Sequence, residues 1–296
     1  MWNILTKQFY RQRKDFEDSC AGRDSGLTFP EGVRCSTDIA YADDGIKAHM
    51  LDIYRPEDSQ EKILPVIINV HGGGLIIGNK EFNRYFCALL CKKGFLVYSI
   101  EYRLIPDCLI YDQIADVFMA MDYIKERLAA DGGDSSHVYM AGDSGGACLI
   151  TYANAIQNST NIARAANVTP SGLRINALGL ISGMFYTSRF DKIGLFLPKY
   201  LYGRDYKKTS FAKYVNPENR ELLNSLAPVW LVTSHNDFLR RYTTDFEKAL
   251  TRAEREHELV VFPKNKKLTH AFSVFEPFLP ESSAVIDMMV EYLRKF

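Results

Sequence analysis

Residues 138–150 have the sequence VYMAGDSGGACLI, in which Ser144 is the centre of a Gly-x-Ser-x-Gly pattern. An apolar, β-favouring segment precedes the serine, and small and then apolar residues without proline follow it. The pattern therefore predicts a strand that turns sharply into a helix. Gly142, Gly145 and Gly146 permit the strained backbone of such a turn and a close approach of helix to strand. This nucleophile elbow would lift the Ser144 Oγ above the edge of a sheet.

Apolar segments of strand length alternate with helical patterns along most of the chain. The expected strands span residues 63–70, 95–102, 138–143, 175–181, 228–233 and 258–262. The expected helices span residues 79–93 (with Asn79 as N-cap), 112–130, 147–156, 239–255 and 282–296. Two earlier strands, 38–41 and 48–54, are joined by the hairpin signal Asp43-Asp44-Gly45. This alternation predicts an α/β fold: one mostly parallel sheet with an antiparallel start and helices on its faces.

Two segments do not follow the alternation. Residues 1–35 carry apolar side chains at loosely helical spacings, which predicts a helical arm: Trp2, Ile4, Leu5, Phe9, Tyr10 and Phe16. Residues 184–222 lie between two strands and are dense in phenylalanine and tyrosine without a regular period. We expect this second segment to be a lid inserted into a single domain that spans residues 1–296.

Composition and charge exclude several classes of protein. Lys plus Arg and Asp plus Glu both number 36, so the formal net charge is zero. A neutral chain has no overall attraction for nucleic acid or an anionic membrane, which leaves only local patches. No apolar run is long enough to span a bilayer, and the first residues do not have the pattern of a signal peptide.

The six cysteines lack paired Cys-x-x-Cys spacing. Free thiols of a reducing compartment are therefore expected, and the protein is assigned to the cytoplasm. Neither a metal nor a cofactor is expected from the residues present.

The histidines can be sorted by their place in the sheet, because chemistry gathers at the carboxyl ends of parallel strands. Three follow such ends: His71, His235 and His270. The other three lie in the hairpin or at the opposite edge: His49, His137 and His257. His270, in the loop after the last strand, is the best candidate for a general base. His235 is expected to be structural or to line the site.

Asp237 is the best candidate for the carboxylate that orients a histidine base. It lies just past the strand at 228–233, whereas Asp245 and Glu247 lie inside the following helix. The alternative role for Asp237 is that of a helix N-cap, which is common for aspartate in this position.

The run His71-Gly72-Gly73-Gly74 follows the strand at 63–70. Consecutive glycines let a loop bring backbone N–H groups close to a substrate, where they can stabilise an oxyanion. The N–H of Gly145, directly after the serine, can supply a further donor. We expect His71 to shape this loop rather than to act as the base.

These motifs resemble those of the hormone-sensitive-lipase-like carboxylesterases, which have the α/β-hydrolase fold. The resemblance runs from about residue 50 to the C-terminus. It rests on His71-Gly72-Gly73-Gly74 and on Gly142-Asp143-Ser144-Gly145-Gly146, where the family usually has Gly-Asp-Ser-Ala-Gly. Residues 102–107, YRLIPD, are similar to the family's Tyr-Arg-Leu-Ala-Pro-Glu. The matches His235-Asn236-Asp237, for Gly-x-Asp, and His270-Ala271-Phe272, for His-Gly-Phe, are looser.

The resemblance implies an α/β-hydrolase with a helical cap formed by residues 1–35 and 184–222. It implies Ser144 as nucleophile, His270 as base and Asp237 as the orienting acid, in the chain order of that fold. Gly73, Gly74 and Gly145 would be the oxyanion donors. The expected activity is that of a serine carboxylesterase, which cleaves short-chain or aryl esters through an acyl-enzyme without a metal.

Four other functions can be weighed against this pattern. The same machinery would serve a deacetylase of sugar or aryl-amide substrates. A ligand-binding protein on a retired hydrolase fold, as in the plant gibberellin receptors, is disfavoured because those receptors lack the histidine that His270 matches. A scaffold role for Lys264–Lys267 is weaker than a solvated loop. A true lipase is disfavoured because no large exposed apolar lid is identifiable from the sequence.

A homodimer through the edge strand occurs in relatives, but nothing in this sequence requires one.

Overall fold

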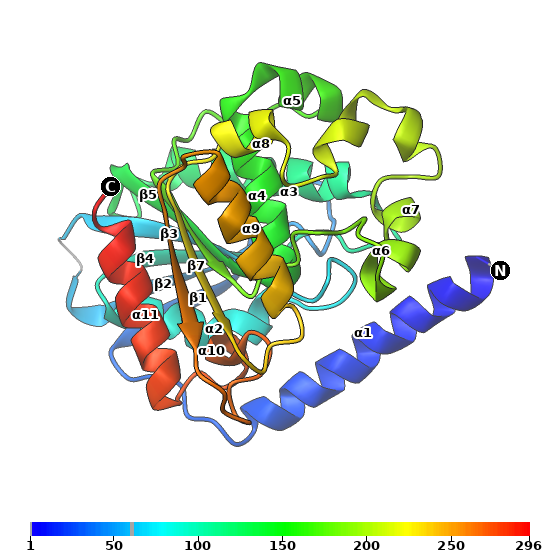
Figure 1. The fold of residues 1–296 in the computed structure, drawn as a ribbon. Helices are drawn as coiled ribbons and strands as arrows, with labels where there is room; N and C mark the ends of the chain where they lie inside the picture. Colours follow the sequence, from blue (N-terminus) through cyan, green and yellow to red (C-terminus); the bar gives the residue numbers. More distant parts are fainter. Residues whose placement is uncertain (1, 60–61) are drawn as a thin grey trace.

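The computed structural model describes residues 2–59 and 62–296, with residues 2–5 described by their backbone alone. Its centre is an eight-stranded sheet with the order β1-β2-β4-β3-β5-β6-β7-β8 (Figure 1). β2 pairs antiparallel with β1 and with β4, and all other neighbours are parallel. The strands are β1 (Val33–Ala40), β2 (Met50–Pro56), β3 (Leu64–Val70), β4 (Leu96–Ile100), β5 (Gly133–Asp143), β6 (Ala177–Ile181), β7 (Val229–Ser234) and β8 (His257–Phe262).

The central strands are apolar on both faces because helices cover the sheet on both sides. In β3, Val66 and Ile68 belong to one hydrophobic cluster and Ile67 to the other, and all three side chains are fully buried. This double burial explains why the strand has a continuous apolar run instead of an alternating pattern. Val70 pairs with Gly142, so β3 and β5 end at the same edge of the sheet.

Two layers of helices enclose the sheet (Figure 1). α2, α10 and α11 contribute to the cluster around Ile67, whereas α3, α4 and α9 contribute to the other cluster. The helices are α1 (Trp2–Asp24), α2 (Arg84–Lys92), α3 (Ile110–Arg127), α4 (Ser144–Asn158), α5 (Thr160–Ala166), α6 (Lys192–Phe196), α7 (Pro198–Leu201), α8 (Arg220–Asn224), α9 (Arg240–Arg252), α10 (Phe272–Phe275) and α11 (Pro280–Leu293). Short 3-10 turns are η1 (Glu57–Ser59), η2 (Lys80–Asn83), η3 (Tyr206–Lys208) and η4 (Ser210–Tyr214).

The expected strands and helices are present, and several of their boundaries differ from expectation. The helical arm ends at Asp24 rather than near residue 35, and β1 begins at Val33. Most β1 side chains are exposed or half-buried, so this edge strand has no apolar alternation to reveal it. β5 begins at Gly133, because its exposed polar residues extend the strand before the buried part. Asn79 caps the 3-10 turn η2 by accepting from Phe82 N at 3.0 Å, and α2 starts only at Arg84.

α1 and the 184–222 segment lie next to each other on one side of the molecule, where α1 (dark blue) passes below α6 (Figure 1). The Phe9 ring packs edge-on against Tyr200, with their centroids 5.1 Å apart. Arg13 ties α1 to the body by donating to the carbonyls of Ile76 and Ile105 at 2.8 and 2.6 Å. The side chains of Trp2, Ile4 and Leu5, which the arm was also predicted to use, lie outside the described residues.

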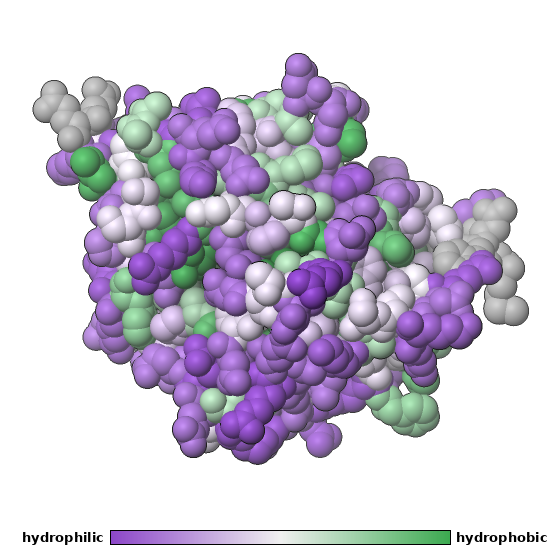
Figure 2. All heavy atoms as spheres, turned by 90° about the horizontal axis from the view of Figure 1, so that it is seen from above, coloured by the Kyte–Doolittle hydropathy of each residue, from purple (hydrophilic) through white to green (hydrophobic). Residues whose placement is uncertain are grey.

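Hydrophilic side chains cover most of the face seen from above (Figure 2). In the part of the chain that the structure describes, no helix has the length and apolar character needed to cross a bilayer, and no cluster of three His, Cys, Asp or Glu side chains could hold a metal ion. All six cysteines are free thiols. Burial raises the pKa of Cys148, on α4, to about 12, so this thiol stays protonated at neutral pH.

Gly146, in the first turn of α4, permits the close contact between this helix and β3. A Cβ at this position would lie 2.1 Å from the Val70 carbonyl oxygen. We expect Gly146→Ala to lower the free energy of unfolding by about 3 kcal/mol or more, since backbone on both sides has to move. Urea unfolding measures this change.

The matched control is Gly22→Ala on α1, where a Cβ would meet nothing within 4 Å. The control should stabilise the protein by up to about 1 kcal/mol, because alanine is the better helix former. A Gly146→Ala protein as stable as the wild type would show that α4 and β3 are not in tight contact.

Candidate active site

Ser144 lies at the junction of β5 and α4, as the predicted strand–turn–helix requires. Its φ of +50° is in the left-handed region, which L-residues adopt at a cost in free energy. The surrounding backbone holds the strained residue in place, because Met184 N donates to the Ser144 carbonyl at 2.9 Å. The serine is therefore presented at the carboxyl end of the strand.

Three side chains from three loops form one hydrogen-bonded chain. His270 Nε2 lies 2.9 Å from Ser144 Oγ, and His270 Nδ1 lies 2.7 Å from Asp237 Oδ1. Because an ionised carboxylate can only accept, Nδ1 carries the proton of the neutral ring and Nε2 is free to accept from Oγ. The geometry allows the imidazole to remove the serine proton.

Asp237 is buried at the end of β7 with a full set of donors around it. Thr233 Oγ1 and Leu239 N each donate to its carboxylate at 2.8 Å, in addition to His270. Burial by itself would raise the pKa of Asp237, but the hydrogen bond and charge of His270 outweigh it and the pKa lies below its usual value. The alternative N-cap role is not found, since α9 begins at Arg240 with Leu239 as its N-cap.

The loop after β3 turns its backbone toward Ser144. Gly73 and Gly74 have φ values of +103° and +62°, which glycine adopts without strain. An added Cβ on Gly145 would lie 2.9 Å from Gly74 N, so the loop lies directly against the first turn of α4. The N–H of Gly145 has no carbonyl partner within its helix. Together, these backbone groups border the space in front of the Ser144 Oγ.

His71 supports this loop from beneath and does not reach Ser144. Its Nε2 lies 3.0 Å from Glu101 Oε1, and its Nδ1 lies 2.8 Å from the Gly72 carbonyl. Tyr102 stacks on the ring and donates to the His71 carbonyl at 2.8 Å. Burial lowers the pKa of His71, yet the Glu101 carboxylate more than offsets this and leaves the pKa raised. Both ring nitrogens face acceptors, which an imidazolium satisfies.

Asp143, directly before the serine, joins the glycine loop to the elbow. Its fully buried carboxyl accepts from Gly72 N and from Asn83 Nδ2, both at 3.0 Å. Burial raises the pKa of this carboxyl. Asp143 therefore supports the backbone of both loops and has no contact of its own with the Ser144 Oγ. The remaining motif residue, Gly142, lies next to the end of β5 and pairs with Val70 of β3.

A cavity of about 450 Å³ opens beside Ser144 and His270. Its other lining residues are mostly apolar and come from α1, the glycine loop, α6 and the loops before α9 and α10: Phe16, Gly73, Gly74, Ile76, Ile77, Phe82, Asp143, Met184, Ile193, Leu197, Phe238, Leu239 and Phe275. The lining indicates room for an uncharged, apolar group next to the serine.

The other histidines lie away from this cavity. His235 is exposed, its Nδ1 lies 2.8 Å from a guanidinium nitrogen of Arg240, and it is not among the residues that line the cavity. His49 is buried with its Nε2 3.1 Å from Asp116 Oδ1. His137 precedes the buried part of β5 and His257 begins β8, so both lie at the far edge of the sheet, as expected.

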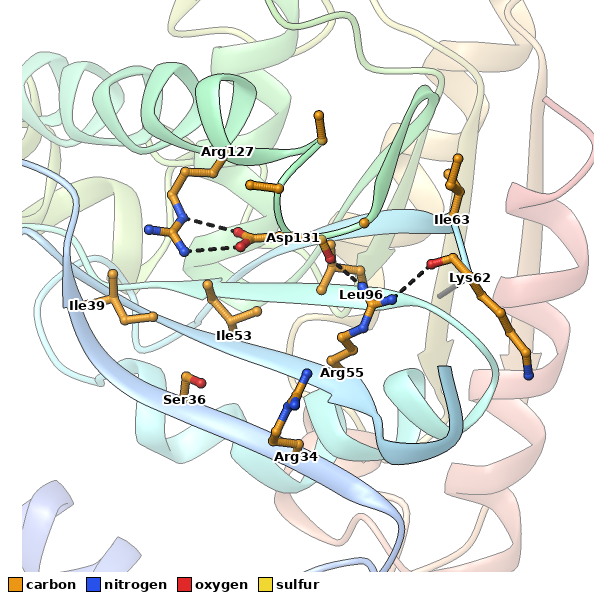
Figure 3. A pocket seen from close by; sticks show the side chains of 13 residues that line it. Arg34, Ser36, Ile39, Ile53, Arg55, Lys62, Ile63, Leu96, Arg127 and Asp131 are labelled. Carbon is orange, nitrogen blue, oxygen red and sulfur yellow. Dashed lines mark hydrogen bonds and ion pairs between the residues drawn. The ribbon is translucent and has the colours of Figure 1, made fainter. Parts of the chain in front are cut away.

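A larger, polar hollow of about 720 Å³ lies at the opposite end of the sheet (Figure 3). Arg55 donates to the carbonyls of Asp131, Ser59 and Lys62 there, and Arg127 pairs with Asp131 at 3.0 Å. These cations hold the connecting loops together. No histidine lines this hollow, so it offers no serine–base pair.

Several supporting residues were not predicted from the sequence. Glu101 and Asn83 hold the glycine loop and the elbow, and Thr233 holds Asp237. Ser182 Oγ accepts from Ala271 N at 3.1 Å and so fixes the loop of His270. Glu101 directly precedes the YRLIPD motif, and this position is the only sequence feature that could have indicated its role. The other supporting residues lie at strand or turn ends without a distinctive spacing.

A family model described as the alpha/beta hydrolase fold matches residues 67–273, which is more than half of the chain. The chain belongs to the α/β-hydrolase family. This membership and the eight-stranded, helix-flanked sheet confirm the fold class and the family resemblance inferred from the motifs.

Relatives of this α/β-hydrolase include proteins named as esterases. A probable isoprenylcysteine alpha-carbonyl methylesterase of Oryza sativa subsp. japonica is 29% identical over 184 residues, which are 58% of this chain and 44% of the relative. Esterase LipQ of Mycobacterium tuberculosis is 32% identical over 120 residues, 40% of this chain and 28% of the relative. The chain thus spans less than half the length of these relatives.

Solved structures show the same fold over nearly the whole chain. Esterase B of Lactobacillus rhamnosis matches with a TM-score of 0.92 and 22% identity, covering 99% of this chain and 95% of that one. An esterase of Pyrobaculum calidifontis matches with a TM-score of 0.70 and 21% identity, covering 97% and 93%. At these identities the likeness concerns the fold.

Gly145 gives a test of the contact between the elbow and the glycine loop. A Cβ at Gly145 would lie 2.8 Å from Leu75 N and 2.9 Å from Gly74 N. We expect Gly145→Ala to push the loop away and to lower kcat/KM for p-nitrophenyl acetate by tenfold or more, since one oxyanion donor contributes about 10²–10³-fold.

The thermal midpoint of Gly145→Ala should change far less than that of Gly146→Ala, because the glycine loop lies at the surface of the cavity. Gly22→Ala is again the matched control and should keep full activity. A Gly145→Ala enzyme with wild-type kcat/KM would contradict the close contact.

Proposed function

We propose that this α/β-hydrolase is a serine carboxylesterase that cleaves short-chain or aryl esters through an acyl-enzyme. The observation that carries the proposal is the hydrogen-bonded chain from Ser144 through His270 to Asp237, which borders an apolar cavity. Relatives and structural neighbours that are named as esterases support the same class of reaction.

In the first half-reaction, Ser144 Oγ attacks the ester carbonyl carbon while His270 Nε2 takes the Oγ proton. The carbonyl π electrons move to oxygen, and the N–H groups of Gly73, Gly74 and Gly145 bind the resulting oxyanion. Asp237 stabilises the imidazolium without taking its proton. Collapse of the tetrahedral intermediate breaks the ester C–O bond, and the imidazolium protonates the leaving alkoxide.

In the second half-reaction, water attacks the acyl-enzyme. His270 takes a proton from that water, the oxyanion forms again at the glycine N–H groups, and the proton returns to Ser144 Oγ as the acid leaves. Every proton is carried by His270, so this reaction needs no metal or cofactor.

The cavity supports a substrate with an uncharged acyl or alcohol group. α1 contributes Phe16 and α6 contributes Ile193 to its wall, which supports a cap formed by α1 and the 184–222 segment over the body of the enzyme. Esterase B has been crystallised with a tributyrin phosphonate inhibitor, so tributyrin is a useful probe beside aryl esters. The same machinery would serve a deacetylase, and aryl acetamides test that alternative.

Ser144→Ala and His270→Ala should each lower kcat for p-nitrophenyl esters, from acetate to laurate, by about 10⁴-fold or more. His235→Ala is the matched control, because this neighbouring exposed histidine lies outside the cavity and should leave kcat unchanged. The wild type should prefer acyl chains that the cavity of about 450 Å³ can enclose.

A folded wild type without turnover on any ester would favour a binding protein over an enzyme. The hydrogen bond between His270 and Ser144 argues against a binding protein, because a site that catalyses no reaction has no need to keep it. Activity that survives in Ser144→Ala would place the nucleophile elsewhere.

Asp237 also predicts a pH dependence of stability. Its folded pKa is lowered, so its contribution is complete above the unfolded pKa, about 3.9, and is lost as the pH falls through the folded value. We expect the stability difference between the wild type and Asp237→Asn to shrink as the pH falls from about 5 to 3. Urea unfolding of both proteins at a series of pH values measures it, and a difference that grows on acidification would contradict the ion pair.

A further inference from the structure

Four large apolar side chains beside the cavity are exposed to solvent. Phe190 is 92% exposed, Phe238 74%, Phe196 63% and Leu195 57%. We call these four residues the apolar rim. Single exposed apolar residues are ordinary on protein surfaces, whereas a group of this size next to a cavity indicates a contact surface.

The members of the apolar rim lie on two segments that are held together. Arg189 pairs with Asp245 at 2.9 Å, and Tyr242 Oη donates to Asp191 at 2.5 Å. The two segments that these contacts join, α6 and the loop before α9, both line the cavity. They do so through Ile193, Leu197, Phe238 and Leu239. The apolar rim therefore flanks the cavity.

Positive charge lies beside the apolar rim. The loop at 263–269 carries Lys264, Lys266 and Lys267, which are exposed and have no acidic group within ion-pair distance among the residues that the structure describes. We call these three residues the lysine loop. His235 N donates to the Phe262 carbonyl at 3.0 Å, and Ser234 Oγ donates to the Leu268 carbonyl. The lysine loop is thereby held against the end of β7, from which the chain leads to Phe238.

Other charged side chains near the cavity add to the positive charge of the lysine loop. Lys192 on α6 and Arg241 on α9 are exposed, and within the described ranges neither forms an ion pair. Across the cavity, two acids of α1 are neutralised within their own helix, because Lys14 pairs with Asp18 and Arg11 with Asp15. Glu17, also on α1, is exposed without such a pair. The net charge of zero conceals a local excess of positive charge around the apolar rim.

We propose that the apolar rim and the lysine loop dock this protein on the surface of an anionic lipid membrane. Exposed phenylalanine and leucine side chains enter the boundary between headgroups and acyl chains, and lysines bind the negative headgroups. This peripheral contact needs no spanning helix. A second copy on a two-fold axis would put the same positive patch on both sides of the interface, and the repulsion disfavours it. Docking does not rest on the proposed esterase activity.

Vesicle co-sedimentation tests the proposal with the Ser144→Ala protein, which cannot hydrolyse the vesicle lipid if the proposed function is correct. The vesicles are phosphatidylcholine alone and phosphatidylcholine with about one third phosphatidylglycerol. We expect binding to the anionic vesicles to exceed binding to the neutral ones by tenfold or more. Raising the salt to 0.5 M should remove most of that difference, because salt screens exposed charges.

Two sets of variants separate the apolar and electrostatic parts. Phe190→Ser/Phe196→Ser lies outside the cavity lining and should lower the partition coefficient on both vesicles by about tenfold or more. Lys264→Glu/Lys266→Glu/Lys267→Glu should lower it on anionic vesicles alone, by about fivefold for each lysine. Ile63→Ser is the apolar control, since Ile63 is 74% exposed before β3 at the other end of the sheet. Lys92→Glu/Lys125→Glu/Arg174→Glu makes the same charge change at that end.

The proposal is supported if the apolar-rim variant and the lysine-loop variant both lose binding while both controls keep it and all proteins keep their thermal midpoints. It is overturned if the Ser144→Ala protein does not sediment with anionic vesicles, or if the apolar-rim and lysine-loop variants bind as well as their controls. It is also overturned if sedimentation velocity without lipid finds a dimer that Phe190→Ser/Phe196→Ser dissociates, which would assign this face to a second copy. Failure of docking would leave ester hydrolysis by the wild type unaffected, so the two proposals fail separately.

Discussion

The contact between the first turn of α4 and the end of β3 is the constraint on which the rest of the site depends. Gly146 brings the helix so close to the Val70 carbonyl that a single added carbon has no room. This approach forces the chain through a sharp turn, and Ser144 occupies the strained position of that turn with φ +50°. The strain is maintained because the sheet and both helical layers are packed around it.

The same contact explains why so many polar groups are buried near the serine. A loop that presents free N–H groups to a cavity cannot satisfy its own backbone, so other side chains must hold it. Asp143 accepts from Gly72 N, and Glu101 holds His71 beneath the loop while also accepting from Lys80 N at 2.8 Å. Charged groups that never contact the Ser144 Oγ therefore define the shape of the space in front of it.

The surface around the cavity has local features of charge and exposure that the overall composition of the chain does not reveal. The formal net charge is zero, yet the exposed Lys264, Lys266 and Lys267 have no acidic partner among the described residues, so local potential and net charge describe different properties. The aromatic residues of the 184–222 segment likewise divide into two groups. Tyr200 and Tyr202 are buried, whereas Phe190 and Phe196 are exposed. The density of aromatic residues in the sequence could not distinguish the buried residues of this segment from the exposed ones.

The sequence by itself determined the sheet class, the elbow and the glycine loop, and it placed Ser144, Asp237 and His270 at the correct edge. These features are local: strand-length apolar runs, glycines at a turn and the side of the sheet where a loop emerges. Only the tertiary structure decided which side chains support them. Glu101, Asn83 and Ser182 act across 21 to 89 residues of sequence, in pairs with no fixed spacing. The edge strand β1 and the exposure of Phe190 also depend on what packs beside them, which no local pattern records.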